Sequence, residues 1–359
     1  MAEIVAFLGM GGTIAGTAQS ADDNVGYTAA QLGVQNLLQS VPGLTRILGA
    51  RQALAEQVCQ IDSKDLMHAD WAALLGRLKH NLARPDVRAV VITHGTDTLE
   101  ETAYFLSRAL APELLAHKPV VLTCAMRPAS SLNPDGPGNL ADAATLAVWP
   151  GARGVLVVCG GKIHGAAQVQ KVHPYRVDAF DSGEAGPLGL VEEGRVRLLA
   201  DFPRADHGQA AVDVEALQAK GWPRVEILLS HAGAGGGLLR ALLREPEGEA
   251  PLRGIVVAGT GNGTIHREMD AGLLLAQARG VRVVRVSRCA YGQVVGDAPE
   301  AVAFSKYALS AVKARIALML DIASEAYADC TSPKQSAASS GPFCACERFT
   351  GTVPQTRVP

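Results

Sequence analysis

The chain has 359 residues, of which 48% are hydrophobic and 19% are charged, and its formal net charge at pH 7 is −2. This length predicts about two domains, and the composition excludes extensive disorder. No long basic stripe suits a nucleic acid, and polar residues interrupt every apolar run before the ~20 residues that a membrane helix requires. We therefore expect a soluble protein that acts on a small molecule and binds neither nucleic acid nor membrane.

The first residues carry no recognisable targeting signal. Glu3 is acidic, no basic region precedes the apolar run, and glycines follow from Gly9 onward. The number of cysteines is odd, and several stand in apolar, strand-like segments, where a free thiol packs as a small hydrophobe. These features favour a reducing cytoplasm, and the spacing of Cys and His residues predicts no metal site.

The first half of the chain alternates short apolar runs with amphipathic segments. We expect buried strands at residues 3–8, 56–61, 87–93, 119–124 and 154–159. Apolar residues recur at helical spacing in segments 64–82 and 99–110. Strands that alternate with helices predict an α/β fold, here a larger N-terminal domain whose mostly parallel sheet is flanked by helices.

The second half resumes this alternation after an interruption. Between residues 183 and 208 only LVEEGRVRLL is typical of a hairpin. Further strands are expected at 225–229, 254–258 and 282–287, with helices near 238–243, 269–278 and 306–327. We predict an N-terminal domain at 1–190, a linker at 191–212, a smaller C-terminal α/β domain at 213–328 and a disordered, Ser- and Pro-rich tail at 329–359.

The loop after the first strand combines glycines with a hydroxyl group. Parallel sheets bind ligands beyond the carboxyl ends of their strands, and Thr13 stands there within GGTIAG. A dinucleotide fingerprint would require glycine where Ile14 stands, and a phosphate-binding loop would require lysine where Thr17 stands. The loop is either a tight turn or a glycine loop that presents one hydroxyl beside backbone N–H groups able to face an oxyanion.

Similar residues follow the next strands. The second strand leads into DSKD, the third into HGTDTLEET and the fourth into AMRP and NPDGPGNL. Thr96 and Asp97 in the third loop form a hydroxyl and carboxylate pair, although the same two residues also suit a helix N-cap. His94, which precedes them, is expected to be a hydrogen-bonded scaffold residue.

Taken in order, GGTIAG, DSKD, HGTDTLEET, AMRP with NPDGPGNL, GPLG and GTGNG resemble the bacterial L-asparaginases over roughly residues 3–327. The resemblance implies a two-domain α/β enzyme that hydrolyses L-asparagine to L-aspartate and ammonia without metal or organic cofactor. It also implies a homotetramer with active sites between subunits.

The resemblance assigns catalytic roles to five residues. Thr13 is the expected nucleophile that forms an acyl-enzyme, and Tyr27 is the tyrosine that orients it. Thr96, Asp97 and Lys171 are the expected second catalytic set. Lys162 stands too early in the chain for the spacing of the family. Whether Tyr27 or Lys171 removes the first proton stays open at this point.

Further positions are expected to bind substrate. Ser63 and Asp97, with help from Thr96, would hold the α-carboxylate and α-ammonium groups, and the Ala125 carbonyl would contact the amide nitrogen. Asn262 in GTGNG would reach the pocket of a neighbouring subunit. Lys64 replaces the glutamine usual in secreted high-affinity relatives, and no neighbouring-subunit Glu aligns near Glu300.

Three other functions compete with an asparaginase. A glutaminase-asparaginase would use the same residues on a longer side chain. The amidase subunit of a tRNA-dependent amidotransferase predicts an additional N-terminal domain, whereas the first strand is expected at residue 3. A catalytically silent amino-acid sensor has no need for two positioned hydroxyls and a proton relay, and is therefore disfavoured.

Overall fold

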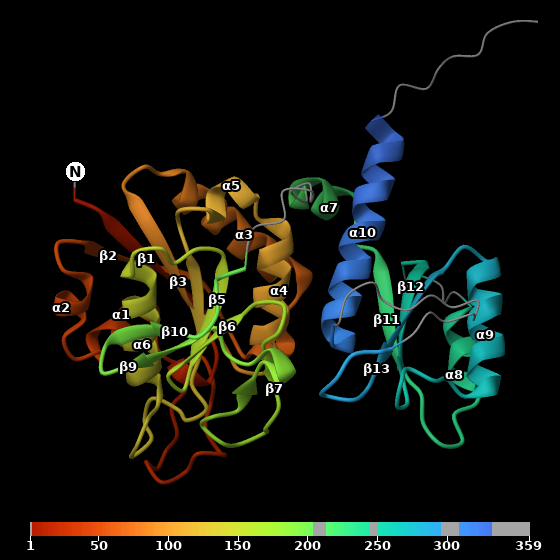
Figure 1. The fold of residues 1–359 in the computed structure, drawn as a ribbon, viewed down its shortest axis with the longest axis horizontal. Helices are drawn as coiled ribbons and strands as arrows, with labels where there is room; N and C mark the ends of the chain where they lie inside the picture. Colours follow the sequence, from red (N-terminus) through yellow and green to blue (C-terminus); the bar gives the residue numbers. More distant parts are fainter. Residues whose placement is uncertain (1, 204–212, 245–247, 249, 296–308, 332–359) are drawn as a thin grey trace, which may run out of the picture.

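The computed structural model describes residues 2–203, 213–244, 248, 250–295 and 309–331 (Figure 1). Within them the chain forms two α/β units, one around an eight-stranded sheet and the other around a three-stranded sheet. No helix in these residues is long and apolar enough to cross a membrane.

The N-terminal unit is built on the larger sheet. Its strand order is β10-β9-β6-β5-β4-β3-β1-β2, parallel from β5 to β2 and antiparallel from β10 to β5, which confirms the predicted mostly parallel sheet. The strands are β1 (Ile4–Gly11), β2 (Gln52–Ile61), β3 (Val87–Thr93), β4 (Val120–Thr123), β5 (Val155–Cys159), β6 (Lys162–Gly165), β9 (Gly189–Glu192) and β10 (Arg195–Leu198). A separate pair is formed by β7 (Gln170–Lys171) and β8 (Phe180–Asp181).

Helices cover both faces of this sheet. One layer contains α1 (Val34–Gln39), α2 (Leu44–Leu48) and α6 (Gly136–Val148), and the other contains α3 (His68–Ala83), α4 (Leu99–Ala109) and α5 (Pro112–Leu115). Successive strand residues point to opposite faces, so that Val5 and Phe7 pack with the first layer whereas Ala6 and Leu8 pack with the second. Three 3₁₀ turns, η1 (Thr13–Ala15), η2 (Ser63–Asp65) and η3 (Gly183–Ala185), follow strands.

The C-terminal unit is smaller and fully parallel. Its sheet has the order β11 (Arg224–Leu229), β12 (Leu252–Gly259), β13 (Arg282–Ser287). Its helices are α8 (Gly237–Leu242), α9 (Arg267–Ala278) and α10 (Ala311–Thr331), whereas α7 (Val214–Lys220), which precedes the sheet in the chain, contacts α3 of the N-terminal unit. In Figure 1, α10 lies between the two sheets, and it packs against both α4 and β12.

Several expected boundaries differ from the structure, and β2, for example, begins at Gln52 rather than at residue 56. The expected linker 191–212 begins too early, because β10 pairs with β9 and extends the first sheet to Leu198. The helix expected from residue 64 begins at His68, since residues 63–65 form η2 and the Asp62 side chain accepts a hydrogen bond from the Lys64 N–H. The expected tail at 329 begins too early as well, because α10 continues to Thr331. Residues 204–212 and 332–359, together with Glu300, lie outside the described residues.

Candidate active site

The two hydroxyl-bearing loops lie against each other at their glycines. After β1, Gly12 adopts a φ of 82°, a conformation that L side chains rarely adopt, and a Cβ atom there would lie 2.3 Å from the Cα of Gly95. Because β1 and β3 are neighbours in the sheet, their carboxyl ends deliver Thr13 and Thr96 to one edge. Glycine at both positions permits this close approach of two backbones.

The Thr13 hydroxyl forms a hydrogen bond with the hydroxyl of a tyrosine on a nearby loop. Thr13 is 7% exposed, and its Oγ1 lies 2.7 Å from the Tyr27 hydroxyl oxygen. Tyr27 precedes Thr28, which pairs with Thr17 through two backbone hydrogen bonds of 2.9 and 3.0 Å. The loop that carries the tyrosine is thus closed at its base, directly beside the residue that contacts Thr13.

The second threonine takes part in a three-residue hydrogen-bond network. The Lys171 ammonium donates to Thr96 Oγ1 at 2.9 Å and to Asp97 Oδ1 at 2.6 Å. Thr96 is buried, the Lys171 side chain is 16% exposed and that of Asp97 is 51% exposed. The structure therefore brings these three predicted residues together, whereas Lys162 lies in β6, paired with Cys159 and Leu190.

Ser63 completes this side of the site. It begins η2 and is 3% exposed, and its Oγ accepts a hydrogen bond of 3.2 Å from the Asp97 N–H. The Thr98 hydroxyl donates to the Ser63 carbonyl at 2.9 Å. The neighbouring Lys64 instead pairs with Asp62 and Asp65 on the surface.

The surroundings of His94 do not support a role as an acid or a base. Its Nδ1 lies 2.8 Å from the Gly95 carbonyl oxygen, and its Nε2 lies 3.0 Å from the hydroxyl of Thr102. A carbonyl only accepts, so these contacts assign the proton of the neutral ring to Nδ1. Burial lowers the pKa of His94 to about 4, which makes it a neutral scaffold residue, as the sequence suggested.

The peptide around Ala125 is held by two side chains of the NPDGPGNL motif. The Asp135 carboxylate accepts hydrogen bonds of 2.9 Å from the N–H groups of Met126 and Arg127. The Asn139 amide donates to the Cys124 carbonyl at 3.0 Å and accepts from the Gly160 N–H. The motif is visible in the sequence, but the roles of its polar residues are not, and the structure shows that they fix the loop after β4.

Asn262 is placed apart from this group. It follows β12 in the C-terminal unit, where its side-chain amide donates to the Val295 carbonyl and accepts from the Val295 N–H, both at 2.8 Å. Within one chain, the structure therefore does not bring Asn262 together with Thr13 or Thr96.

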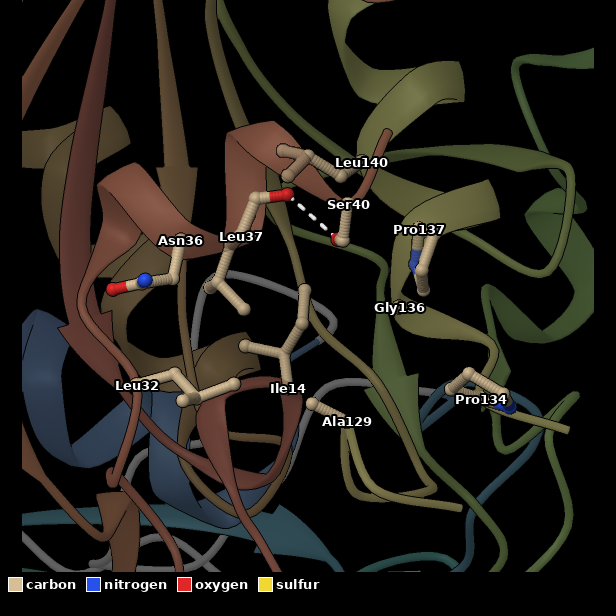
Figure 2. A pocket seen from close by; sticks show the side chains of 10 residues that line it. All are labelled: Ile14, Leu32, Asn36, Leu37, Ser40, Ala129, Pro134, Gly136, Pro137 and Leu140. Atoms are coloured by element: carbon tan, nitrogen blue, oxygen red, sulfur yellow. Dashed lines mark hydrogen bonds between the residues drawn. The ribbon is translucent and has the colours of Figure 1, made fainter. Parts of the chain in front are cut away.

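A mainly apolar cavity of about 220 Å³ adjoins the first loop. Figure 2 shows Ile14, the neighbour of Thr13, directed into it together with Leu37 from α1 and Pro134 from the loop before α6. One of the polar residues that line it, Ser40, already donates its hydroxyl hydrogen bond to the Leu37 carbonyl at 2.7 Å. Since none of the polar site residues lines this cavity, it is not the space in which the hydroxyls act. No group of three or more His, Cys, Asp or Glu side chains in the described ranges could hold a metal ion.

Both units match known protein families. Residues 4–204 match the family model described as "Asparaginase, N-terminal", and residues 224–329 match "Glutaminase/Asparaginase C-terminal domain". L-asparaginase 2 of Escherichia coli (strain K12) is 36% identical over 324 residues, which are 88% of each chain. Glutaminase-asparaginase of Pseudomonas fluorescens biotype A is 35% identical over 296 residues, which are 81% of this chain and 77% of that protein.

The fold also matches a solved structure. The crystal structure of a probable cytoplasmic L-asparaginase from Campylobacter jejuni superposes with a TM-score of 0.80 at 37% sequence identity, covering 89% of this chain and 95% of that one. The match thus spans both units.

Proposed function

Because the chain belongs to the asparaginase family, we propose that it is an L-asparaginase that hydrolyses L-asparagine to L-aspartate and ammonia through an acyl-enzyme on Thr13. One observation carries this proposal. Two buried threonine hydroxyls, one bonded to Tyr27 and the other to Lys171, stand on loops whose glycines touch.

In the first half of the reaction, the Thr13 oxygen attacks the carbon of the side-chain amide. A threonine hydroxyl is a weak nucleophile until a neighbouring group accepts its proton, and Tyr27 is placed at 2.7 Å to do so. The carbon–nitrogen bond then breaks, ammonia leaves with the proton it gains, and an ester to Thr13 remains. In the second half, water attacks this ester, and Thr13 regains its proton as aspartate leaves.

Backbone N–H groups are expected to stabilise the negatively charged oxygen in both halves. The N–H of Gly12 is already bonded to the Ile61 carbonyl, and that of Asp97 to Ser63. We therefore assign this role to the N–H groups of Thr13 and Thr96, which lie on the two touching loops. Donors of this kind commonly supply the largest electrostatic contribution in acyl transfer.

The groups around Ser63 are proposed to orient the substrate. The half-exposed Asp97 carboxylate suits an α-ammonium group, and the Ser63 hydroxyl and Thr96 suit the α-carboxylate. The Ala125 carbonyl, in the peptide held by Asp135 and Asn139, would accept from the amide nitrogen. No metal or organic cofactor has a part in these steps.

We further propose a homotetramer in which Asn262 completes the pocket of a neighbouring subunit. Exposed large apolar side chains on α8 and α9 support buried contacts between chains, namely Leu238, Leu274 and Leu275. The solved relative that is named a probable cytoplasmic asparaginase supports a cytoplasmic location.

A second candidate is a glutaminase-asparaginase, which the Pseudomonas relative favours. Ammonia release measured with L-Asn, L-Gln, D-Asn and aspartyl peptides distinguishes the two. A kcat/KM for L-Gln within tenfold of that for L-Asn would support the second candidate.

The Thr13→Ala variant tests the mechanism. It removes the atom that becomes acylated and leaves the Ser63 and Asp97 contacts in place, so kcat should fall on the order of 10³-fold or more, about 4 kcal/mol of transition-state stabilisation. Thr145→Ala, which removes a hydroxyl bonded to the Ala141 carbonyl on α6, is the matched control. Near-normal turnover by Thr13→Ala would refute the proposal.

A further inference from the structure

One lysine is fully buried at the boundary between the two units. Lys313 lies in the first turn of α10, and its side chain has no exposed surface. Burying an ammonium group without partners is strongly unfavourable. The groups that bind this ammonium therefore indicate its role. Its Nζ donates to the carbonyl oxygens of Ala167, at 3.0 Å, and of Val169, and it lies 3.8 Å from Glu100 Oε2.

All three partners belong to the N-terminal unit and lie beside Lys171. Ala167 and Val169 precede β7, of which Lys171 is the second residue. Glu100 connects the two lysines, because its Oε1 accepts a hydrogen bond of 3.3 Å from the Lys171 N–H while its Oε2 faces Lys313. The ammonium of Lys313 thus contacts the chain just before Lys171 and the carboxylate that holds the Lys171 backbone.

The segment around Lys171 has little regular structure of its own. Strand β7 contains two residues and pairs only with β8, outside the main sheet. An isolated two-stranded pair is marginally stable in water. The position of the Lys171 side chain therefore depends on groups that hold this segment from outside, and α10 supplies one of them.

We propose that Lys313 is a positioning residue for Lys171, through which the C-terminal unit sets the contacts of the Lys171 ammonium with Thr96 and Asp97. Lys313 touches none of the reacting groups and acts by holding two carbonyls and Glu100. The inference rests on the proposed function, because it requires Lys171 to take part in the reaction.

The electrostatics of the pair agree with this geometry. Burial lowers the pKa of Lys313 to about 8, and the neighbouring carboxylates of Glu100 and Glu101 oppose this shift. Burial raises the pKa of Glu100, and the Lys313 charge opposes that shift in turn. Removal of Lys313 would therefore leave Glu100 a buried carboxyl without its counter-charge and would weaken its hold on the Lys171 backbone.

The test compares two variants of the full-length chain that loosen the same helix pair. Lys313→Met keeps the length of the side chain and removes the ammonium. Asp321→Asn weakens the ion pair of 3.1 Å between Asp321 on α10 and Arg108 on α4, away from β7. For each variant, kcat and KM are measured by ammonia release from L-asparagine, and the melting temperature is recorded.

We expect Lys313→Met to lower kcat about tenfold to a hundredfold, the size of effect that a misplacement of about 1 Å produces, with KM within about threefold of wild type. Asp321→Asn should keep kcat within about twofold even if it melts at a lower temperature. The proposal would be overturned if both variants lost the same factor in kcat while their melting temperatures fell equally. It would also be overturned if Lys313→Met kept the kcat of wild type.

Two further variants keep every outcome decisive. If Lys313→Met does not fold, Lys313→Gln retains amide N–H donors for the carbonyls but no charge, and its kcat should lie clearly below that of wild type; an unchanged kcat would overturn the proposal. Lys171→Met, which removes the ammonium bonded to Thr96 and Asp97, provides the reference for direct loss of that group. Full activity in Lys171→Met would refute the proposed role of that residue, whereas loss in Lys171→Met with full activity in Lys313→Met would refute only the inference.

Discussion

The contact between Gly12 and Gly95 makes Gly12→Ala the sharpest test of how the site is assembled. Gly12 has a φ of 82° and a ψ of −172°, which is a conformation open almost only to glycine. An added methyl group would lie 2.3 Å from the Gly95 Cα and 2.4 Å from the Gly95 N. Both neighbours are backbone atoms and cannot rotate away.

The structure gives the size of the expected effect. Ordinary van der Waals contact begins at 3.4 Å, so the two loops must separate by about 1.1 Å. A displacement of that size can cost about a hundredfold in rate, because reacting groups must stay within a fraction of an ångström of their alignment. The strained backbone adds about 1–3 kcal/mol of destabilisation. We therefore expect kcat to fall about a hundredfold while the protein still folds.

The assay compares Gly12→Ala with Gly49→Ala. Gly49 also has a positive φ, of 63°, with a ψ of −123°, yet an added Cβ there would meet nothing within 4 Å. Both variants should melt at a lower temperature than wild type because of backbone strain. Only Gly12→Ala should have a lower kcat for ammonia release from L-asparagine. A kcat for Gly12→Ala within about threefold of that for Gly49→Ala would refute the reasoning.

Two further predictions concern protonation and assembly. The pKa of His94 falls from 6.5 to about 4 in the folded chain, so its contribution to stability is complete above pH 6.5 and is lost as pH falls toward 4; an NMR titration midpoint above pH 6 for its imidazole would contradict this. If Asn262 completes a neighbouring pocket, dilution below the assembly constant should reduce specific activity, and a monomer with full specific activity in light scattering would refute the shared site.

The sequence predicted those elements in which pattern and packing agree. The run of β-branched residues from Val87 to Thr93 predicted β3 at its observed bounds, because a parallel strand buried on both faces reads as continuous apolar residues. The predicted linker began too early although LVEEGRVRLL had the pattern of a hairpin. Its second strand, β10, is a half-exposed edge strand, and the boundary at residue 191 cut through the hairpin that pairs it with β9.

The candidate site was predicted from motifs, whereas its support was not. Thr96, Asp97 and Lys171 were grouped by resemblance, and the hydrogen bonds among them are consistent with that grouping. Lys313 escaped notice because a lysine on an amphipathic helix usually faces solvent. Its burial depends on carbonyls about 145 residues earlier in the chain, a tertiary contact that no local pattern encodes.

The packing of α10 has a consequence for how the chain folds. Ile316 and Met319 of this helix share one apolar cluster with Phe105 of α4 and Trp71 of α3, so the two sheets are joined by a common interior. A chain cut between them would leave the outer face of α4 uncovered on one fragment and α10 without its partner on the other. Although the family models divide the sequence in two, we expect the two units to unfold together, because a large apolar interface couples domains that would otherwise move independently.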